Sequence, residues 1–241
     1  MLGYPGRTAA LVAIVLVLGG CGGAGPGNGG TPTPQATIAA PKLAIASLLP
    51  YREVPPAPPG DTIVDAMGPI EVTGVIGEPS RQVMTCTRRE LPAEHDPGPA
   101  EPDAAGAASA GFVTGVAQVD QYAIVYTDTD AAQRAVSRAR ALAEDCDAAF
   151  AVHAPEADAE ATIATAPAIV DGFRVHSTYA YEDTGYSSDE VSAVLRRGPT
   201  VLYLRANETG SPAGLGWETD GILDPEWADQ LVEAAAEHLA Q

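Results

Sequence analysis

Residues 113–126, VTGVAQVDQYAIVY, and the following residues 127–146, TDTDAAQRAVSRARALAEDC, decide the fold. Polar and apolar residues first alternate and then give way to Ala123-Ile124-Val125, which is apolar on both faces of a strand. This change is typical of a central strand that is covered on both sides. Helical spacing follows, in steps of four and three residues, at Ala132, Val136, Ala139, Ala143 and Cys146. The stretch therefore predicts a central strand and then a helix that Asp130 caps.

Further strands and a closing helix are expected on either side of this unit. Turn residues and β-branched runs predict strands at residues 70–76, 82–87, 172–181, 190–197 and 200–206. Arg197-Gly198-Pro199 is expected to join the last two strands as a hairpin turn. Asp224 and Pro225 open a closing helix with Trp227, Leu231, Ala235 and Leu239 on its inward side. The order of elements predicts an α+β fold: a largely antiparallel sheet with helices packed on one face, in a single domain.

The N-terminal residues carry a secretory signal. Arg7 precedes an apolar run at residues 8–18, which is shorter than the ~20 residues that a membrane-spanning helix needs. The run ends in Leu18-Gly19-Gly20-Cys21, which resembles the lipobox of bacterial lipoproteins. We expect residues 1–20 to be a lipoprotein signal peptide and Cys21 to carry lipid such as palmitate. An ordinary signal peptide, or a buried helix with a chance cysteine, is the alternative.

The composition after the signal peptide predicts two parts, a tether and a folded domain. Residues 21–42 are rich in Gly, Pro and Thr and are expected to be the lipid anchor and a flexible tether. Residues 43–241 are expected to form the α+β domain, with residues 91–111 as a long flexible loop inside it. The net charge of −19 argues against a nucleic-acid partner and against electrostatic membrane binding. Lipid on Cys21 is therefore the predicted membrane contact, on the extracytoplasmic face of the cell membrane.

Three cysteines are present, and lipid on Cys21 leaves Cys86 and Cys146. Two cysteines in an exported domain indicate one disulfide. Two free buried thiols or a pair of metal ligands are the alternatives, although two ligands are too few for a structural zinc site.

Neither a catalytic motif nor a cofactor motif is evident. The nucleophile elbow, the H-E-x-x-H motif, the P-loop and the G-x-G-x-x-G motif are absent, so no enzyme activity, cofactor or metal is predicted. Tyr179, Tyr181 and Tyr203 lie on neighbouring predicted strands and are candidates for a ligand groove, with His176 as a candidate polar contact. Ordinary packing in the sheet is the alternative for all four. A hydrolase would need His176 paired with Glu182 or Asp183.

Four segments of the sequence resemble an actinobacterial family. They are the Leu48-Leu49-Pro50 entry, the strand at residues 119–126, the helix that ends in Cys146 and the closing helix at 228–239. That family is the PknH-like extracellular (sensor) domain, which occurs outside receptor kinases and as free-standing lipoproteins. The resemblance implies a helix-flanked antiparallel sheet with a cleft for a small-molecule or cell-envelope ligand. We therefore expect a lipid-anchored, non-catalytic binding or sensor-like domain. A lipid or glycolipid carrier and a protein-interaction module are the alternatives.

Overall fold

The computed structural model describes residues 39–56, 63–77, 79, 100–114, 117–145, 157–181, 186–208 and 223–241. They belong to one compact unit that spans residues 37–241. The strands are β1 (Ile63–Glu71), β2 (Ala104–Thr114), β3 (Ala117–Tyr126), β4 (Ala157–Thr165), β5 (Asp171–Tyr181), β6 (Tyr186–Arg197) and β7 (Thr200–Glu208). The helices are α1 (Ala40–Ala46), the short 3-10 helix η1 (Tyr51–Glu53), α3 (Thr129–Glu144) and α5 (Pro225–Ala240).

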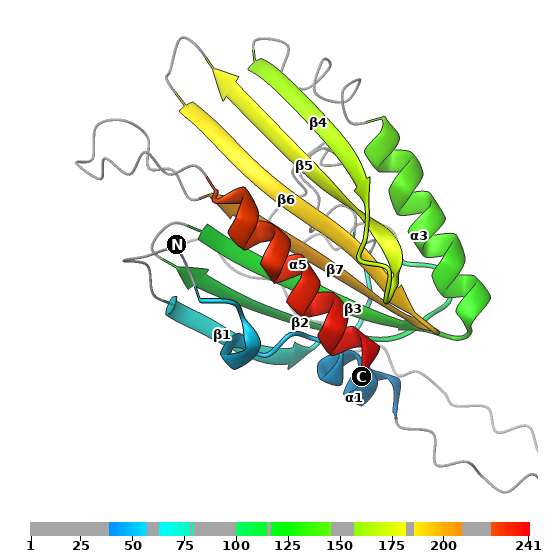
Figure 1. Ribbon diagram of the computed structural model, residues 1–241. Coiled ribbons are helices and arrows are strands. Elements are labelled where there is room, and N and C mark those ends of the chain that lie inside the picture. Colours follow the sequence, from blue (N-terminus) through cyan, green and yellow to red (C-terminus); the bar gives the residue numbers. More distant parts are fainter. Residues whose placement is uncertain are drawn as a thin grey trace, which may run out of the picture. The chain divides into compact units, whose positions relative to one another are not determined.

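All seven strands form one antiparallel sheet in the order β1-β2-β3-β7-β6-β5-β4 (Figure 1). β3 lies inside the sheet, and its C-terminal half is buried on both faces. Ala123 and Val125 belong to the core on the side of α1 and α5, whereas Ile124 and Tyr126 belong to the core under α3. The fold class and the central position of this strand, both predicted from the sequence, are confirmed.

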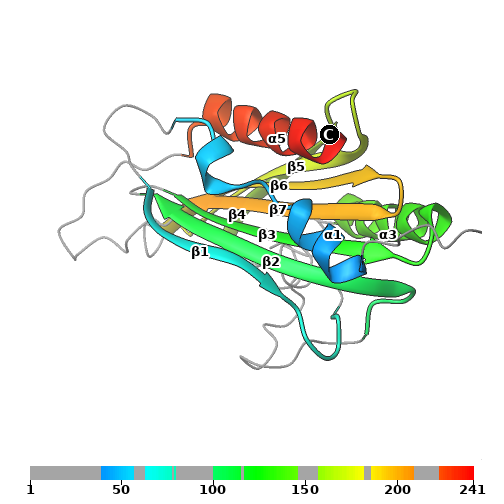
Figure 2. The same ribbon diagram turned by 90° about the horizontal axis from the view of Figure 1, so that it is seen from below.

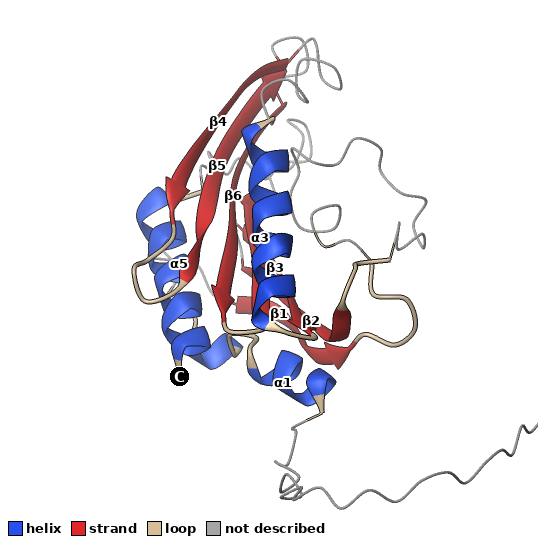
Figure 3. Ribbon diagram, turned by 90° about the vertical axis from the view of Figure 1, so that its right-hand side faces the viewer, coloured by secondary structure: helices blue, strands red, loops and turns tan. Residues whose placement is uncertain are grey.

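The helices cover both faces of the sheet, so the prediction that they share one face is wrong. α3 packs on one face, over Tyr122, Phe173 and Tyr203. α1 and α5 pack on the opposite face, α1 against β1, β2 and β3 and α5 against β6 and β7 (Figures 2 and 3). The physical reason is that strands apolar on both faces must bury both faces, which one layer of helices cannot do.

α3 and α5 otherwise follow the sequence pattern. The buried face of α3 consists of Ala131, Ala132, Ala135, Val136, Ala139 and Ala143. Small helix residues fit the large side chains of the sheet beneath them. The N-cap of α3 is Asp128 and not Asp130, because the Asp128 carboxylate accepts the Ala131 N–H at 2.7 Å. Asp224 caps α5 as predicted, and Trp227, Leu231, Ala235 and Leu239 are buried.

Several segments differ from the sequence prediction. Residues 104–111 belong to β2, although they were expected to be part of a flexible loop, and residues 113 and 114 end β2 and do not begin β3. The strand expected at residues 70–76 lies earlier, as β1, and β4 was not predicted. α1 begins at Ala40, within the expected tether at residues 21–42. Residues 104–111 of β2 are all Ala or Gly except for Ser109, and the weak strand propensity of these residues hides a strand that tertiary packing stabilises.

Candidate functional site

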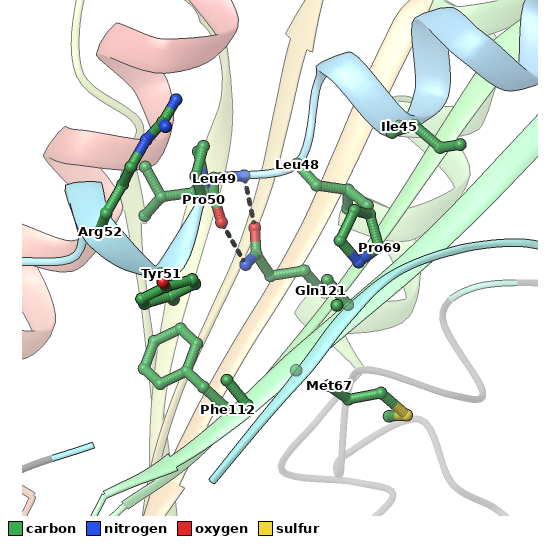
Figure 4. A pocket seen from close by; sticks show the side chains of 14 residues that line it. Ile45, Leu48, Leu49, Pro50, Tyr51, Arg52, Met67, Pro69, Phe112 and Gln121 are labelled. Carbon is green, nitrogen blue, oxygen red and sulfur yellow. Dashed lines mark hydrogen bonds between the residues drawn. The ribbon is translucent and has the colours of Figure 1, made fainter. Parts of the chain in front are cut away.

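A pocket of about 310 Å³ lies on the face of the sheet that carries α1. One side is the end of α1 and the segment that follows it, and the other is the β1–β2 edge of the sheet. The lining residues are Ile45, Leu48, Leu49, Pro50, Tyr51, Arg52, Ala66, Met67, Gly68, Pro69, Ala110, Gly111, Phe112 and Gln121. We call residues 48–52 the roof segment, because they cross over the strands (Figure 4).

Gln121 of β3 fixes the roof segment to the sheet. Its side chain is 3% exposed and makes two hydrogen bonds with the backbone of one residue. The Leu49 N–H donates to Oε1 at 2.9 Å, and Nε2 donates to the Leu49 carbonyl at 3.0 Å. Leu48 and Leu49 are themselves buried. Because the amide pairs with both backbone groups of Leu49, this residue can be buried over the sheet without leaving its N–H or carbonyl unpaired.

Most side chains around the pocket are apolar, and its rim is open to solvent. Phe112 is buried, whereas Tyr51 and Met67 at the rim are 63% and 57% exposed. The guanidinium of Arg52 extends away from Gln121 and Phe112 in Figure 4. The Gln121 amide is already engaged with Leu49. The pocket is therefore suited to an apolar group and not to a charged one.

Two of the predicted site residues, Tyr203 and His176, do not line this pocket and lie on opposite faces of the sheet. Tyr203 is 1% exposed in the core under α3, where its hydroxyl lies 3.4 Å from that of Tyr126. His176 is exposed on the other face, because it alternates with the buried Phe173 and Val175, and its Nε2 contacts Asp189. Tyr203 and His176 therefore do not form one site.

Other predictions fall on parts of the chain that the structure does not describe. The side chains of Tyr179 and Tyr181 and the residues Glu182 and Asp183 lie outside the described residues. The same holds for the signal peptide at residues 1–20, the lipidated Cys21, the strand at 82–87 and the disulfide between Cys86 and Cys146. These remain predictions of the sequence.

Sequence reasoning missed the pocket, although one signal for it was present. Leu48-Leu49-Pro50 stood out as an apolar run between segments rich in Pro, Gly and Ala. Its burial could be expected, but its partner could not. Gln121 is 72 positions away from Leu49, and nothing in its own neighbourhood marks its side chain as buried.

Tyrosine hydroxyls and Glu101 form a buried polar cluster under α3. The Tyr126 hydroxyl donates to Glu101 Oε1 at 2.9 Å, and Arg138 forms an ion pair with the same carboxylate. The Tyr122 hydroxyl is buried and has no hydrogen-bond partner among the described atoms. Burial, and secondarily the charge of Glu101, raises the pKa of Tyr122 to about 12. Burial also raises the pKa of Tyr126.

Tyr122→Phe is expected to increase the free energy of unfolding at pH 7 by about 1 kcal/mol, because it removes an unpaired buried hydroxyl. Tyr126→Phe is the matched control and should lower it by about 1–2 kcal/mol, since the Glu101 carboxylate loses a donor. Urea unfolding measures both. Equal losses in the two variants would contradict the assignment.

The raised pKa of Tyr122 also makes the free energy of unfolding depend on pH. The folded pKa of Tyr122, about 12, lies above its ordinary value of 10.0. Titration of Tyr122 therefore leaves the stability unchanged below pH 10 and lowers it as the pH rises toward 12, because the unfolded chain loses this proton first. We expect Tyr122→Phe to lose less stability than the wild type over that interval.

Within the described residues, no helix is long and apolar enough to cross a membrane. Among these described residues, no group of three or more His, Cys, Asp or Glu side chains is placed to hold a metal ion.

Two solved mycobacterial structures are similar to this chain. One is the X-ray structure of an uncharacterised protein of Mycobacterium smegmatis, the Rv0999 orthologue, with a TM-score of 0.44 and 12% identity; the match covers 84% of this chain and 98% of that one. The other is the crystal structure of the extracellular domain of PknH from Mycobacterium tuberculosis, with a TM-score of 0.44 and 14% identity; the match covers 82% of this chain and 97% of that one.

The second match is to the group that the sequence resembles, and at this level of similarity no ligand or activity follows from it. No family model and no curated protein matches the sequence.

Proposed function

We propose that this chain is a lipid-anchored, non-catalytic binding domain that takes a small apolar ligand between the roof segment and the β1–β2 edge. The observation that carries the proposal is the apolar pocket of about 310 Å³ over a buried glutamine. Binding sites for small molecules are concave, mostly apolar and usually ~300–1,000 Å³ in volume. This pocket has those properties at the lower end of the size range.

The size and the lining define the ligand class. A volume near 310 Å³ suits a short acyl chain or a small aromatic molecule better than a whole glycolipid. Leu48, Leu49 and Phe112 supply apolar contact, and the rim at Tyr51 and Met67 leaves room for a polar end in solvent. A carrier that encloses a complete lipid is the less favoured reading for this reason.

The proposed location rests on the sequence. Lipid on Cys21 would hold the protein at the extracytoplasmic face of the cell membrane, and a net charge of −19 would not. α1 begins at Ala40, so fewer than twenty residues separate the proposed lipid from the first described helix. A tether of this length keeps the pocket near the membrane surface.

Ala110→Leu tests the proposal by filling the pocket. Ala110 lines the pocket and lies two positions from Phe112 on the same face of β2. We expect at least tenfold weaker binding of N-phenyl-1-naphthylamine, an uncharged apolar fluorophore, because the leucine occupies its space. Stability should rise by up to about 2 kcal/mol, since the added methyl and methylene groups become buried.

Ala105→Leu is the matched control, because Ala105 is an exposed residue of the same strand and does not line the pocket. It should leave fluorophore binding unchanged. Native mass spectrometry of the purified chain would identify a ligand that co-purifies. A chain that binds no apolar probe, or an Ala110→Leu variant that binds as the wild type does, would overturn the proposal.

A protein-interaction module is the second candidate, and the exposed edge of the sheet favours it. β1 is an edge strand, and Met67, Ile70 and Val75 are large apolar residues exposed in or just after it. Edge strands can pair with an extended segment of a partner. Binding of a partner protein that Ala110→Leu does not affect would favour this function over the pocket.

A further inference from the structure

His238 joins three elements at the two ends of the roof segment. It lies in the last turn of α5, and its side chain is 16% exposed. Nδ1 lies 2.9 Å from Oε2 of Glu53, the last residue of η1 and the first residue after the roof segment. Nε2 lies 3.0 Å from the carbonyl oxygen of Ala46, the last residue of α1, which precedes the roof segment. One imidazole therefore contacts both sides of the segment that covers the pocket.

Both neighbours of this ring are hydrogen-bond acceptors. A carboxylate and a backbone carbonyl have no proton to give, so each needs an N–H from the ring. A neutral imidazole has only one N–H, whereas an imidazolium has two. The two contacts can both be hydrogen bonds only when His238 is protonated. In the neutral form, one contact brings a ring lone pair against an acceptor oxygen.

The surrounding dipoles favour the cation as well. The C-terminal ends of α1 and α5 both lie at His238, and a helix C-terminus attracts positive charge. Around the ring, α1 carries the charged residue Lys42, η1 carries Arg52 and Glu53, and the last two turns of α5 carry Glu233 and Glu237. Arg52 opposes the cation, but its side chain is exposed, and its Nε lies 3.6 Å from the other oxygen of Glu53.

We propose that His238 is a proton-controlled clamp on the roof segment. The imidazolium holds Ala46 and Glu53 together and keeps the roof closed over the pocket, while Gln121 holds its middle at Leu49. Loss of the proton releases one end. The claim that the clamp regulates ligand binding rests on the proposed function. The claim that it holds the roof segment closed does not depend on that function.

The direction of the pH effect follows from linkage. The closed roof binds a proton more tightly than the open roof, so acid favours the closed state, and this advantage is lost as the pH rises. A ligand held under the closed roof is therefore bound more tightly in acid and is released toward alkaline pH.

Glu53→Gln separates this clamp from a general effect of pH. The glutamine amide has nearly the shape of the carboxylate but can donate a proton to the unprotonated Nδ1 of His238. Nε2–H then donates to the Ala46 carbonyl, so both contacts persist with a neutral ring. Glu237→Gln is the matched control: it removes the same charge from the residue next to His238, and its exposed side chain has no part in the clamp.

The test measures N-phenyl-1-naphthylamine binding to the full chain at about pH 5.5 and about pH 8. We expect the wild type and Glu237→Gln to bind about fivefold more weakly at the higher pH, the equivalent of one lost hydrogen bond. Glu53→Gln should show no such change. A flat wild-type profile, or a Glu53→Gln profile with the wild-type slope, would overturn the clamp.

Amide hydrogen exchange of residues 47–54, without any probe and corrected for the intrinsic effect of pH, separates the two hypotheses. If no probe binds at either pH, the proposed function fails, but the clamp still predicts slower exchange in acid for the wild type and no such difference for Glu53→Gln. Equal protection of this segment at both pH values in the wild type would overturn the clamp even where the pocket binds its probe.

Discussion

Gly106→Ala is expected to lower the free energy of unfolding by about 2–3 kcal/mol, because a methyl group at this position collides with the backbone of α1. A Cβ atom built on Gly106 lies 2.6 Å from the Pro41 nitrogen and 2.7 Å from the Ala40 carbonyl carbon. These are backbone atoms, so α1 itself must move to make room. Denaturant unfolding measures the loss.

The same displacement should weaken the pocket. α1 leads directly into the roof segment, and Ile45 near its end lines the pocket. We expect weaker binding of the apolar fluorophore in Gly106→Ala than in the wild type.

Gly68→Ala provides the control for this variant. Gly68 lies on β1, the strand next to β2, and no atom lies within 4 Å of a Cβ built there. Its substitution should change stability by no more than about 0.5 kcal/mol. Equal losses in both variants would show that α1 does not pack on Gly106 as described.

Gln121→Leu should cost about 2–4 kcal/mol, because it leaves the buried N–H and carbonyl of Leu49 without their partner. Leucine retains most of the volume of glutamine, so the loss reports the two hydrogen bonds and not a cavity. Beyond the global loss, the roof segment should open locally. Hydrogen exchange at the Leu49 amide should become much faster, and fluorophore binding should be lost.

Gln118→Leu is the same substitution on the same strand. Gln118 is half-buried, and its amide bonds only the nearby Asp120 carboxylate among the described residues. A change within about 0.5 kcal/mol is expected. Wild-type protection of the Leu49 amide in Gln121→Leu would contradict the role assigned to Gln121.

Elements with strong local patterns were predictable. β3, α3, the β6–β7 hairpin and α5 carry periodic apolar residues, capping residues or a turn, each of which acts over a few positions. The N-cap of α3 was misplaced by two residues, at Asp130 in place of Asp128, because both aspartates stand before the same helix. Such boundaries depend on which competing cap the first turn selects.

Elements made of small residues were not predictable in the same way. β2 contains AAGAASAG, which indicates a loop by composition, yet Gly106 and Ala108 are small because α1 lies against them. β4 alternates around alanine and lies at the edge of the sheet, where little apolar surface is buried. The two faces covered by helices were implied by Ala123-Ile124-Val125, but the pattern does not say which helix covers which face.

By itself, the sequence determined the α+β class, the central strand, the two long helices and the expectation of a lipid anchor at Cys21, because these follow from periodicity, capping and a contiguous motif. Only the tertiary structure decided where the pocket lies. Its roof depends on Leu49 with Gln121, 72 positions apart, and on Ala46 with His238, 192 positions apart. Contacts across such separations form when the packed core brings their elements together, so no local pattern encodes them.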